Sequence, residues 1–259
     1  MRAEPAQAKN GKAGNYALLY QAIGLALFLL LWYLLTLCFP PMVVPTIPQV
    51  FRKLLAIIQG KKFLSTVLIT ILRFLIGLGI GVALGTVLGI LFGINRHVEG
   101  ILSPYISMIQ AVPPVCWVVL ALVWFGFNGK PCIFIVATAS VPAMVLNLSK
   151  GVHNIDPELL EMGKLYHFSR RKTLAHIILP SIRPYYLSAL NIVIGGGWKL
   201  VVMGEVLTTS TGIGGAITTA RLNIEPDAII AWALILVALC FLTERLLKLL
   251  LLGGKWQNA

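Results

Sequence analysis

Long apolar segments dominate this sequence and determine what the chain can fold into. The segment Phe63–Phe92 contains a single charged side chain, Arg73, and exceeds the roughly 20 helical residues that cross a bilayer's hydrocarbon core. Only helices and closed barrels satisfy all their backbone hydrogen bonds in lipid, so we expect an all-α membrane protein with about six transmembrane helices. The predicted spans are residues 16–39, 63–92, 101–127, 131–148, 183–207 and 229–252.

The composition excludes an ordinary soluble domain. Charged residues make up 12% of the chain and the mean hydropathy is +0.88, whereas about a quarter of the residues in a soluble domain are charged. We expect residues 15–259 to form one transmembrane domain in the lipid bilayer, after a short cytoplasmic tail, residues 1–14. The scattered cysteines and histidines lack the spacing of a metal site.

The basic residues predict the orientation. With the N-terminus in the cytoplasm and six spans, 13 Lys and Arg residues lie on the inside and six on the outside. This asymmetry follows the positive-inside rule. The net charge of +12 therefore reflects cytoplasmic ends of membrane helices, and we expect no binding to nucleic acid.

Charged side chains within the predicted spans are candidates for function, because each is costly in lipid and must face protein or a water-filled path. Arg73 and Glu205 lie at compatible depths and can form an ion pair. Lys199 is six positions from Glu205, about 240° around a helix, so these two do not share a face. Two roles remain open for these charged residues: they form an ion pair that stabilises the assembly, or one or more of them line the translocation path. The candidate path residues are Arg73, Trp198, Lys199 and Glu205.

The second predicted span carries a glycine at every fourth position. A stripe of this kind allows a neighbouring helix to approach closely, and close packing drives helix association in membranes. We therefore interpret the stripe as a packing surface rather than a substrate site. Its members are Gly77, Gly81, Gly85 and Gly89.

A charged segment, residues 156–180, interrupts the apolar sequence inside the predicted loop 149–182. Asp156 can cap a helix whose first position is a proline, and Ser169 can cap a second short helix. Pro180 is expected to break the chain before the next span. Two short helices joined by a tight turn form a knob that can dock into a groove on another protein.

One face of the first knob helix is expected to be apolar at helical spacing, through Leu159, Leu160, Gly163 and Tyr166. Glu158 lies near the positive end of the helix. The candidate docking residues are Glu158, Leu159, Leu160, Glu161, Met162, Gly163, Tyr166 and His167.

This segment resembles the EAA loop of the membrane subunits of bacterial ABC importers. Glu161, Met162 and Gly163 occupy the E-A-A positions, and Leu179-Pro180 matches the terminal Leu-Pro of the motif. The family glycine falls on His167. A glycine there would supply a positive φ at the turn between the helices, and histidine tolerates that conformation better than most residues.

The resemblance extends from Thr66 to Lys248, where the chain is similar to permease subunits of the nitrate/sulfonate/taurine importer family. The matching positions are Arg73, Gly77, Gly85–Gly93, Pro104, Val112-Pro113, Trp124-Phe125-Gly126, Gly151-Val152, Leu179-Pro180, Glu205 and Gly212-Ile213-Gly214. It implies the type I importer permease fold, in which the knob is a cytoplasmic coupling helix, and a place in a bacterial cell membrane.

The resemblance also implies partners. These are a second copy of the permease, a pair of ATP-binding subunits that hold ATP and Mg on the cytoplasmic face, and an external substrate-binding protein. The chain itself has no phosphate-binding loop and no hydrolase motif. We therefore expect a non-catalytic subunit without a cofactor, and ATP hydrolysis on a separate subunit.

Two other functions remain open at this point. One is a stand-alone carrier coupled to an ion gradient, which would use Arg73, Lys199 and Glu205. The other, less favoured, is an intramembrane enzyme. A carrier needs no helix that docks onto an ATPase.

The substrate also stays open. The family carries small sulfonates, nitrate, taurine and similar anions, and related permeases carry neutral or cationic heterocycles.

Overall fold

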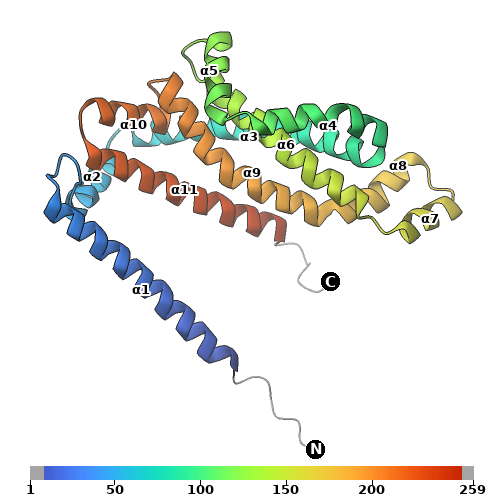
Figure 1. Cartoon of the computed structure of the whole chain (residues 1–259), viewed down its shortest axis with the longest axis horizontal. Coiled ribbons are helices and arrows are strands. Elements are labelled where there is room, and N and C mark those ends of the chain that lie inside the picture. Colours follow the sequence, from blue (N-terminus) through green and yellow to red (C-terminus); the bar gives the residue numbers. More distant parts are fainter. Residues whose placement is uncertain (1–8, 253–259) are drawn as a thin grey trace, which may run out of the picture.

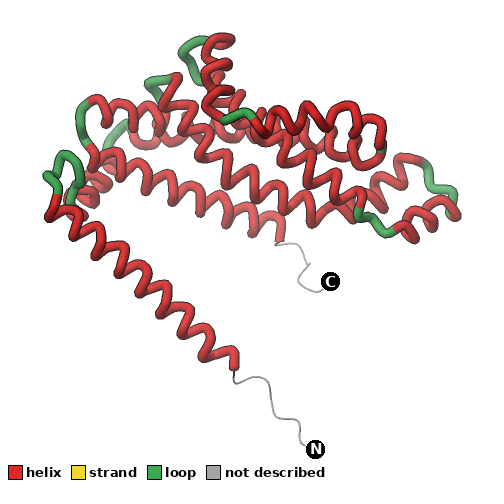
Figure 2. The backbone as a smooth tube through the Cα atoms, viewed as in Figure 1, coloured by secondary structure: helices red, strands yellow, loops and turns green. Residues whose placement is uncertain are grey.

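The structure is a computed structural model that describes residues 9–252, a chain of helices joined by short connections (Figures 1 and 2). The helices are α1 (Lys9–Cys38), α2 (Ile47–Gln59), α3 (Phe63–Ile94), α4 (Arg96–Ala111), α5 (Pro114–Phe125), α6 (Lys130–His153), α7 (Pro157–Leu165), α8 (Arg170–Thr173), η1 (Leu174–Ile178), α9 (Leu179–Thr208), α10 (Gly212–Leu222) and α11 (Pro226–Leu252).

The centre of the bundle is formed by α3, α6 and α9, with α6 packed closely between the other two. Its largest buried side chains include Phe74 of α3 and Trp198 of α9, whose rings stack with centroids 4.4 Å apart. The Trp198 indole N–H donates to Oγ1 of Thr243 on α11 at 2.9 Å, which ties α11 to the bundle. Figure 1 shows α2 and α10 at one end of the bundle and α7 and α8 at the other.

The membrane spans agree with the sequence in number and order. Five helical segments of the described chain are long and apolar enough to cross a membrane, or six if α4 and α5 together form one span. The bend between α4 and α5 is 96°. It falls at Val112-Pro113, where the sequence predicts a broken helix because proline cannot continue the backbone hydrogen bonding.

The first span is separate from the bundle. None of the apolar window in Leu19–Cys38 is buried within the chain, and Figure 1 shows α1 running away from the other helices. Its end is held by the Trp32 indole N–H, which donates to the carbonyl of Pro45 at 3.1 Å. α1 begins at Lys9, within the predicted tail 1–14; residues 1–8 lie outside the described part.

Three other features differ from the sequence prediction. The fourth span continues past Leu148 to His153, so the loop is shorter than residues 149–182. Pro180 does not break the chain: α8, η1 and α9 form one continuous helical segment, and the π-helical turn η1 precedes the proline. The wider turn fits a residue that lacks an N–H. The third difference is α10, in a Thr- and Gly-rich segment where no helix was predicted.

The glycine stripe of α3 packs against α6, as expected of a packing surface. All four glycines are buried, and a Cβ atom added at Gly81 would lie 2.6 Å from Cβ of Ser140 and 2.7 Å from the carbonyl oxygen of Ala137. Gly77, Gly85 and Gly89 meet α6 in the same way. The helices are therefore close enough to exclude side chains along this stripe.

Replacing Gly81 with Leu is expected to destabilise the bundle, since overpacking a close contact costs about 1–3 kcal/mol or more. The matched control is Gly79→Leu on the same helix, because an added Cβ there meets no atom within 4 Å. Thermal unfolding of the purified protein in detergent measures both. Equal melting temperatures for the two variants would contradict the close packing of α3 on α6.

Candidate functional site

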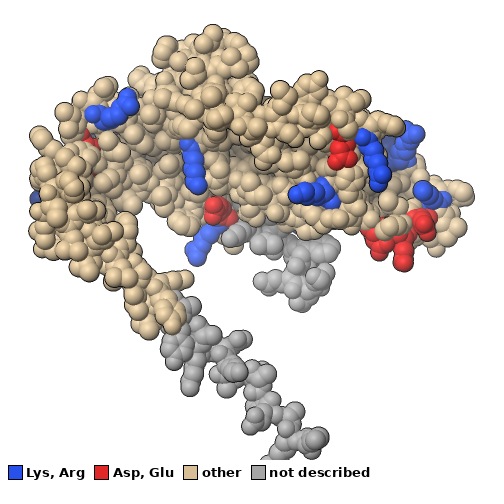
Figure 3. Space-filling view, viewed as in Figure 1, with Lys and Arg blue, Asp and Glu red and all other residues tan. Residues whose placement is uncertain are grey.

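The helical knob, residues 156–180, lies at one end of the bundle, where acidic and basic side chains gather on an otherwise mostly uncharged surface (Figure 3). α7 begins as the sequence predicts: Oδ1 of Asp156 accepts the backbone N–H of Glu158 at 2.9 Å. Ser169 caps α8, and its Oγ accepts the N–H of Lys172 at 3.4 Å. The knob therefore has two defined helix starts.

The turn between the knob helices depends on His167, whose φ of 50° confirms the predicted left-handed conformation. The N–H of His167 donates to the carbonyl of Lys164 at 3.0 Å, and that of Phe168 to the carbonyl of Gly163 at 2.8 Å. This pair of bonds is the Schellman motif, which ends a helix at a residue in the left-handed region. The histidine thus fills a role that glycine usually has.

The face that α7 presents outward differs from the predicted one. Gly163 is buried, and a Cβ added to it would lie 2.8 Å from Cδ1 of Ile177 on η1. Leu160 packs into the core cluster beneath the knob. Gly163 and Leu160 therefore seat α7 on its own chain. The reason is that the π-helical turn brings Ile177 beneath α7. The exposed apolar side chains are Leu159, Met162, Leu165 and Tyr166.

A polar cluster at the opposite end of the bundle centres on Glu205, which is fully buried. Its Oε1 lies 2.7 Å from Nη1 of Arg73, so the predicted pair between α3 and α9 is present. The hydroxyl of Thr70 lies 2.9 Å from the other carboxylate oxygen, and the N–H of Gly214 donates to that oxygen at 2.9 Å. We call Thr70, Arg73, Glu205, Thr211 and Gly214 the Glu205 cluster.

The Glu205 cluster joins three helices, because its partners come from α3, α9 and the start of α10. Arg73 also donates to Thr211, through Nη1 to the carbonyl at 3.0 Å and through Nη2 to Oγ1 at 2.8 Å. The N–H of Ile213 donates to Thr70 Oγ1 at 2.8 Å. The carboxylate thus lies at the N-terminus of α10, where free N–H groups favour negative charge.

Two glycines make this arrangement possible. Gly212 has a φ of 83°, which side chains rarely adopt, and a Cβ there would collide with the Glu205 carboxylate. A Cβ on Gly214 would lie 2.6 Å from the carbonyl oxygen of Val202. The motif Gly212-Ile213-Gly214 is therefore needed for α10 to approach the buried carboxylate.

The remaining path candidates are not brought together. Trp198 is 1% exposed and belongs to the core, so in this structure it does not line a path. Lys199 is exposed on α9, away from the Glu205 cluster. Since Arg73 and Glu205 are held by each other and by α10, they are poorly placed as the titrating groups of an ion-coupled carrier.

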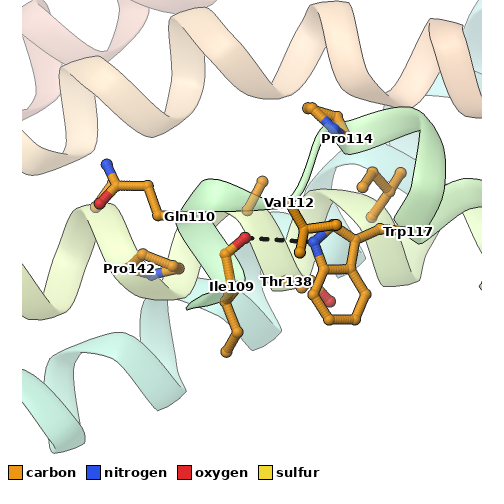
Figure 4. Close-up of a pocket in the computed structure, with 10 residues that line it drawn as sticks. Ile109, Gln110, Val112, Pro114, Trp117, Thr138 and Pro142 are labelled. Carbon is orange, nitrogen blue, oxygen red and sulfur yellow. Dashed lines mark hydrogen bonds between the residues drawn. The ribbon is translucent and has the colours of Figure 1, made fainter. Parts of the chain in front are cut away.

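A pocket of 130 Å³ lies beside the break between α4 and α5 (Figure 4). The Trp117 indole N–H donates to the carbonyl of Ile109 at 3.3 Å and holds the two helices at their bend. Thr138 and Pro142 of α6 form the opposite wall. A second pocket of 140 Å³ adjoins it on α6 and α9, sharing Ala139 and Ala143. Broken helices in membranes line cavities, which makes this surface a candidate path.

Sequence reasoning missed Thr70, Thr211, Trp117 and the backbone of Gly214. Thr70 had a readable signal, because it lies three positions before Arg73 and so on the same helix face. Thr211 and the N–H of Gly214 depend on where α10 folds back, which helical periodicity does not show.

Comparisons with known proteins agree with this architecture. A family model described as "binding-protein-dependent transport system inner membrane component" matches residues 81–251. The taurine transport system permease protein TauC of Escherichia coli (strain K12) is 27% identical over 227 residues, 85% of this chain and 82% of TauC. The aliphatic sulfonates transport permease protein SsuC of the same organism is 33% identical over 146 residues. That match spans 56% of this chain and 55% of SsuC, about half of each.

Solved structures show the same fold. A bacterial ABC transporter for import of the acidic polysaccharide alginate has a TM-score of 0.62 at 14% identity, covering 93% of this chain and 99% of that chain. An amino acid ABC transporter has a TM-score of 0.58 at 18% identity, covering 76% and 94%. Both are type I importer permease folds. Because the family model covers most of the bundle, the knob and Glu205, the chain belongs to the inner membrane components of binding-protein-dependent transport systems and is a permease of the ABC importer class.

Proposed function

We propose that this permease pairs with a second copy of itself, binds an ATP-binding subunit on each helical knob, and imports a small anion delivered by an external binding protein. In this arrangement ATP and Mg bind the partner subunits, and the permease supplies the path. The observation that carries the proposal is the exposed apolar surface of α7 at a charged end of the molecule.

That surface fits a protein partner better than lipid. Leu165 and Tyr166 are 76% and 68% exposed, and Leu159 and Met162 about 40% each. They are flanked by Glu158 and Glu161, which are also exposed. The knob helix α7 lies outside the membrane spans. A helix there that exposes apolar side chains beside acidic ones suits an apolar groove with basic edges on a partner protein.

The proposed substrate class follows from the named relatives and from charge. The relatives are named for transport of taurine, aliphatic sulfonates and bicarbonate, all of which carry an anionic oxygen group. The end of the bundle opposite the knob carries exposed Arg52, Lys61, Lys62, Lys130 and Arg221. An excess of positive charge at the entrance raises the local concentration of an anion.

The proposed orientation places the N-terminus and the knob in the cytoplasm of a bacterial cell and the Glu205 cluster at the outer side. The bias of Lys and Arg supports it. The α4–α5 break and the adjoining pockets then lie along the proposed path, within the membrane.

We expect the purified permease to show no ATP hydrolysis, and its complex with the cognate ATP-binding subunit to contain two copies of each chain. Native mass spectrometry and a phosphate-release assay test both points. Proteoliposomes of the complex, supplied with the binding protein, should accumulate a radiolabelled sulfonate when ATP is enclosed, and not a cationic amine. Hydrolysis by the permease alone, or uptake without ATP, would contradict the proposal.

A further inference from the structure

Lys199 places a positive charge in the middle of a membrane span. It is exposed on α9, nine residues before the helix ends at Thr208. At about 1.5 Å per residue this is about 13.5 Å, close to the middle of a hydrocarbon core of about 30 Å. Lysines near a helix end can extend to the headgroup layer, but Lys199 is too deep to do so. Its ammonium group must therefore face water or protein rather than lipid.

The ammonium group of Lys199 is available for a ligand. Among the described residues it forms neither a hydrogen bond nor an ion pair. An opposite charge lies nearby, because Oε1 of Glu244 on α11 is 3.4 Å from the position of a Cβ atom added to Gly195, one turn before Lys199. Figure 3 shows acidic and basic side chains together over α9 and α11, midway along the bundle. The carboxylate partly balances the lysine and leaves its three N–H donors free.

The turn of α9 that precedes Lys199 leaves space beside it, because it consists of glycines, residues 195–197. A Cβ atom added to Gly196 would meet no atom within 4 Å. Gly196 lines the pocket of 140 Å³ between α6 and α9, opposite Ser140 of α6. Side chains on a helix lean toward its N-terminus, over the preceding turn. Lys199 therefore borders this pocket from the turn above Gly196.

The pocket and its lysine suit a small anion. The walls are mostly apolar, and the hydroxyl of Ser140 already donates to the carbonyl of Val136 at 2.7 Å. Lys199 thus supplies the N–H donors, which fit an oxygen-rich group such as a sulfonate or a carboxylate. Charge attraction is also stronger beside apolar walls than in bulk water.

We propose that Lys199 and the pocket at Gly196 form a binding site for the anionic group of the substrate on its way through the membrane. This inference rests on the proposed import of an anion, and it extends that function by assigning selectivity to one side chain of the permease. The pocket adjoins the pocket beside the α4–α5 break, with which it shares Ala139 and Ala143. The site therefore lies on the candidate path.

The test is cysteine labelling of the full chain in leaky proteoliposomes, which admit reagents from both sides. In a variant whose four native cysteines are changed to alanine, Gly196→Cys adds a thiol to the pocket without a clash. The reagents are two thiosulfonates of similar size, one with a sulfonate group and one with a trimethylammonium group. Lys199→Gln should lower the ratio of anionic to cationic labelling rates at least about fivefold, the effect of one unit charge at about 4 Å in water. Lys199→Arg keeps the charge and should retain the ratio.

Two controls separate this site from the rest of the membrane surface. Gly79→Cys on α3 also adds a thiol to an open position within a span, but between the exposed apolar side chains of Ile76 and Ile80, so neither reagent should label it. Arg96→Gln removes an exposed positive charge from the start of α4 and should leave the ratio at Gly196→Cys unchanged.

The site is refuted if Gly196→Cys is as unreactive as Gly79→Cys, because the pocket is then closed to water. It is also refuted if Lys199→Gln and the unmodified Lys199 give the same ratio of labelling rates. Labelling needs neither ATP nor a partner protein. An anion preference at Gly196→Cys in a complex that takes up no sulfonate would therefore support the site and contradict the proposed import.

Discussion

Replacing Arg73 with Gln is expected to destabilise the permease by about 3–5 kcal/mol, the cost of leaving one member of a buried ion pair without its partner. The carboxylate of Glu205 is fully buried, and the side chain of Arg73 is 13% exposed. Water therefore cannot replace the lost guanidinium. Thermal unfolding of the detergent-solubilised protein measures the change, and the amount of protein in the membrane should fall with it.

The matched control is Lys53→Gln, which breaks the ion pair between Lys53 and Glu225. This pair is almost as short, at 2.8 Å, but its side chains are 33% and 40% exposed. An exposed pair contributes about 0–1 kcal/mol, so the control should unfold close to the unmodified protein. A similar loss in both variants would show that burial of Glu205 does not determine the cost.

Combining Arg73→Gln with Glu205→Gln should be less damaging than Arg73→Gln alone, because the second change removes the unpaired charge. The double variant should still be less stable than the unmodified protein. Glu205 also accepts hydrogen bonds from Thr70 and Gly214, and a glutamine side chain can satisfy only part of this set. Strictly additive losses would mean that Arg73 and Glu205 do not interact.

The sequence predicts the spans well because a bilayer imposes a strong pattern. A helix such as α3 must be apolar for its whole length, so both of its ends are visible, and the break at Val112-Pro113 follows from proline chemistry. The pairing of Arg73 with Glu205 was also predictable, since each charge in a span needs a partner. These inferences use rules that apply to each segment separately.

Features that depend on contacts between segments were not predictable in the same way. The inward position of Gly163 depends on the π-helical turn that places Ile177 beneath it, and nothing in the helical spacing of α7 distinguishes this face from the other. The same holds for α10, whose start is fixed by hydrogen bonds to Thr70 and Glu205 rather than by apolar periodicity. Pro180 misled the prediction because a π-helical turn can precede a proline without ending the helix.

Changing Met162 to Asp should release the ATP-binding subunit. Met162 is 41% exposed on the outward face of α7, and burying a methionine side chain contributes about 1.5–3 kcal/mol, or roughly 10- to 100-fold in affinity. A carboxylate cannot enter the same apolar groove without a partner. Glu161→Lys should weaken the same contact by reversing a charge. A pull-down of the ATP-binding subunit and an uptake assay measure both effects.

Leu222→Asp is the control for these variants, since Leu222 is a 73% exposed leucine on α10, at the end of the bundle opposite the knob. It should leave the association of the ATP-binding subunit unchanged. Equal association of the Met162→Asp and Leu222→Asp variants would show that α7 is not the docking helix.

Substitutions at Gly163 test the contact of α7 with η1, whereas those at Met162 test the docking surface of α7. Gly163→Ala should retain uptake, because the added Cβ meets only Cδ1 of Ile177, the mobile end of a side chain that can shift. Alanine is also the residue that the EAA pattern has at this position. Gly163→Trp should abolish uptake and release the ATP-binding subunit while the protein still inserts into the membrane, since the indole would lift α7 off η1. If Gly163→Trp keeps full association and uptake, the position of α7 on Ile177 does not matter for coupling.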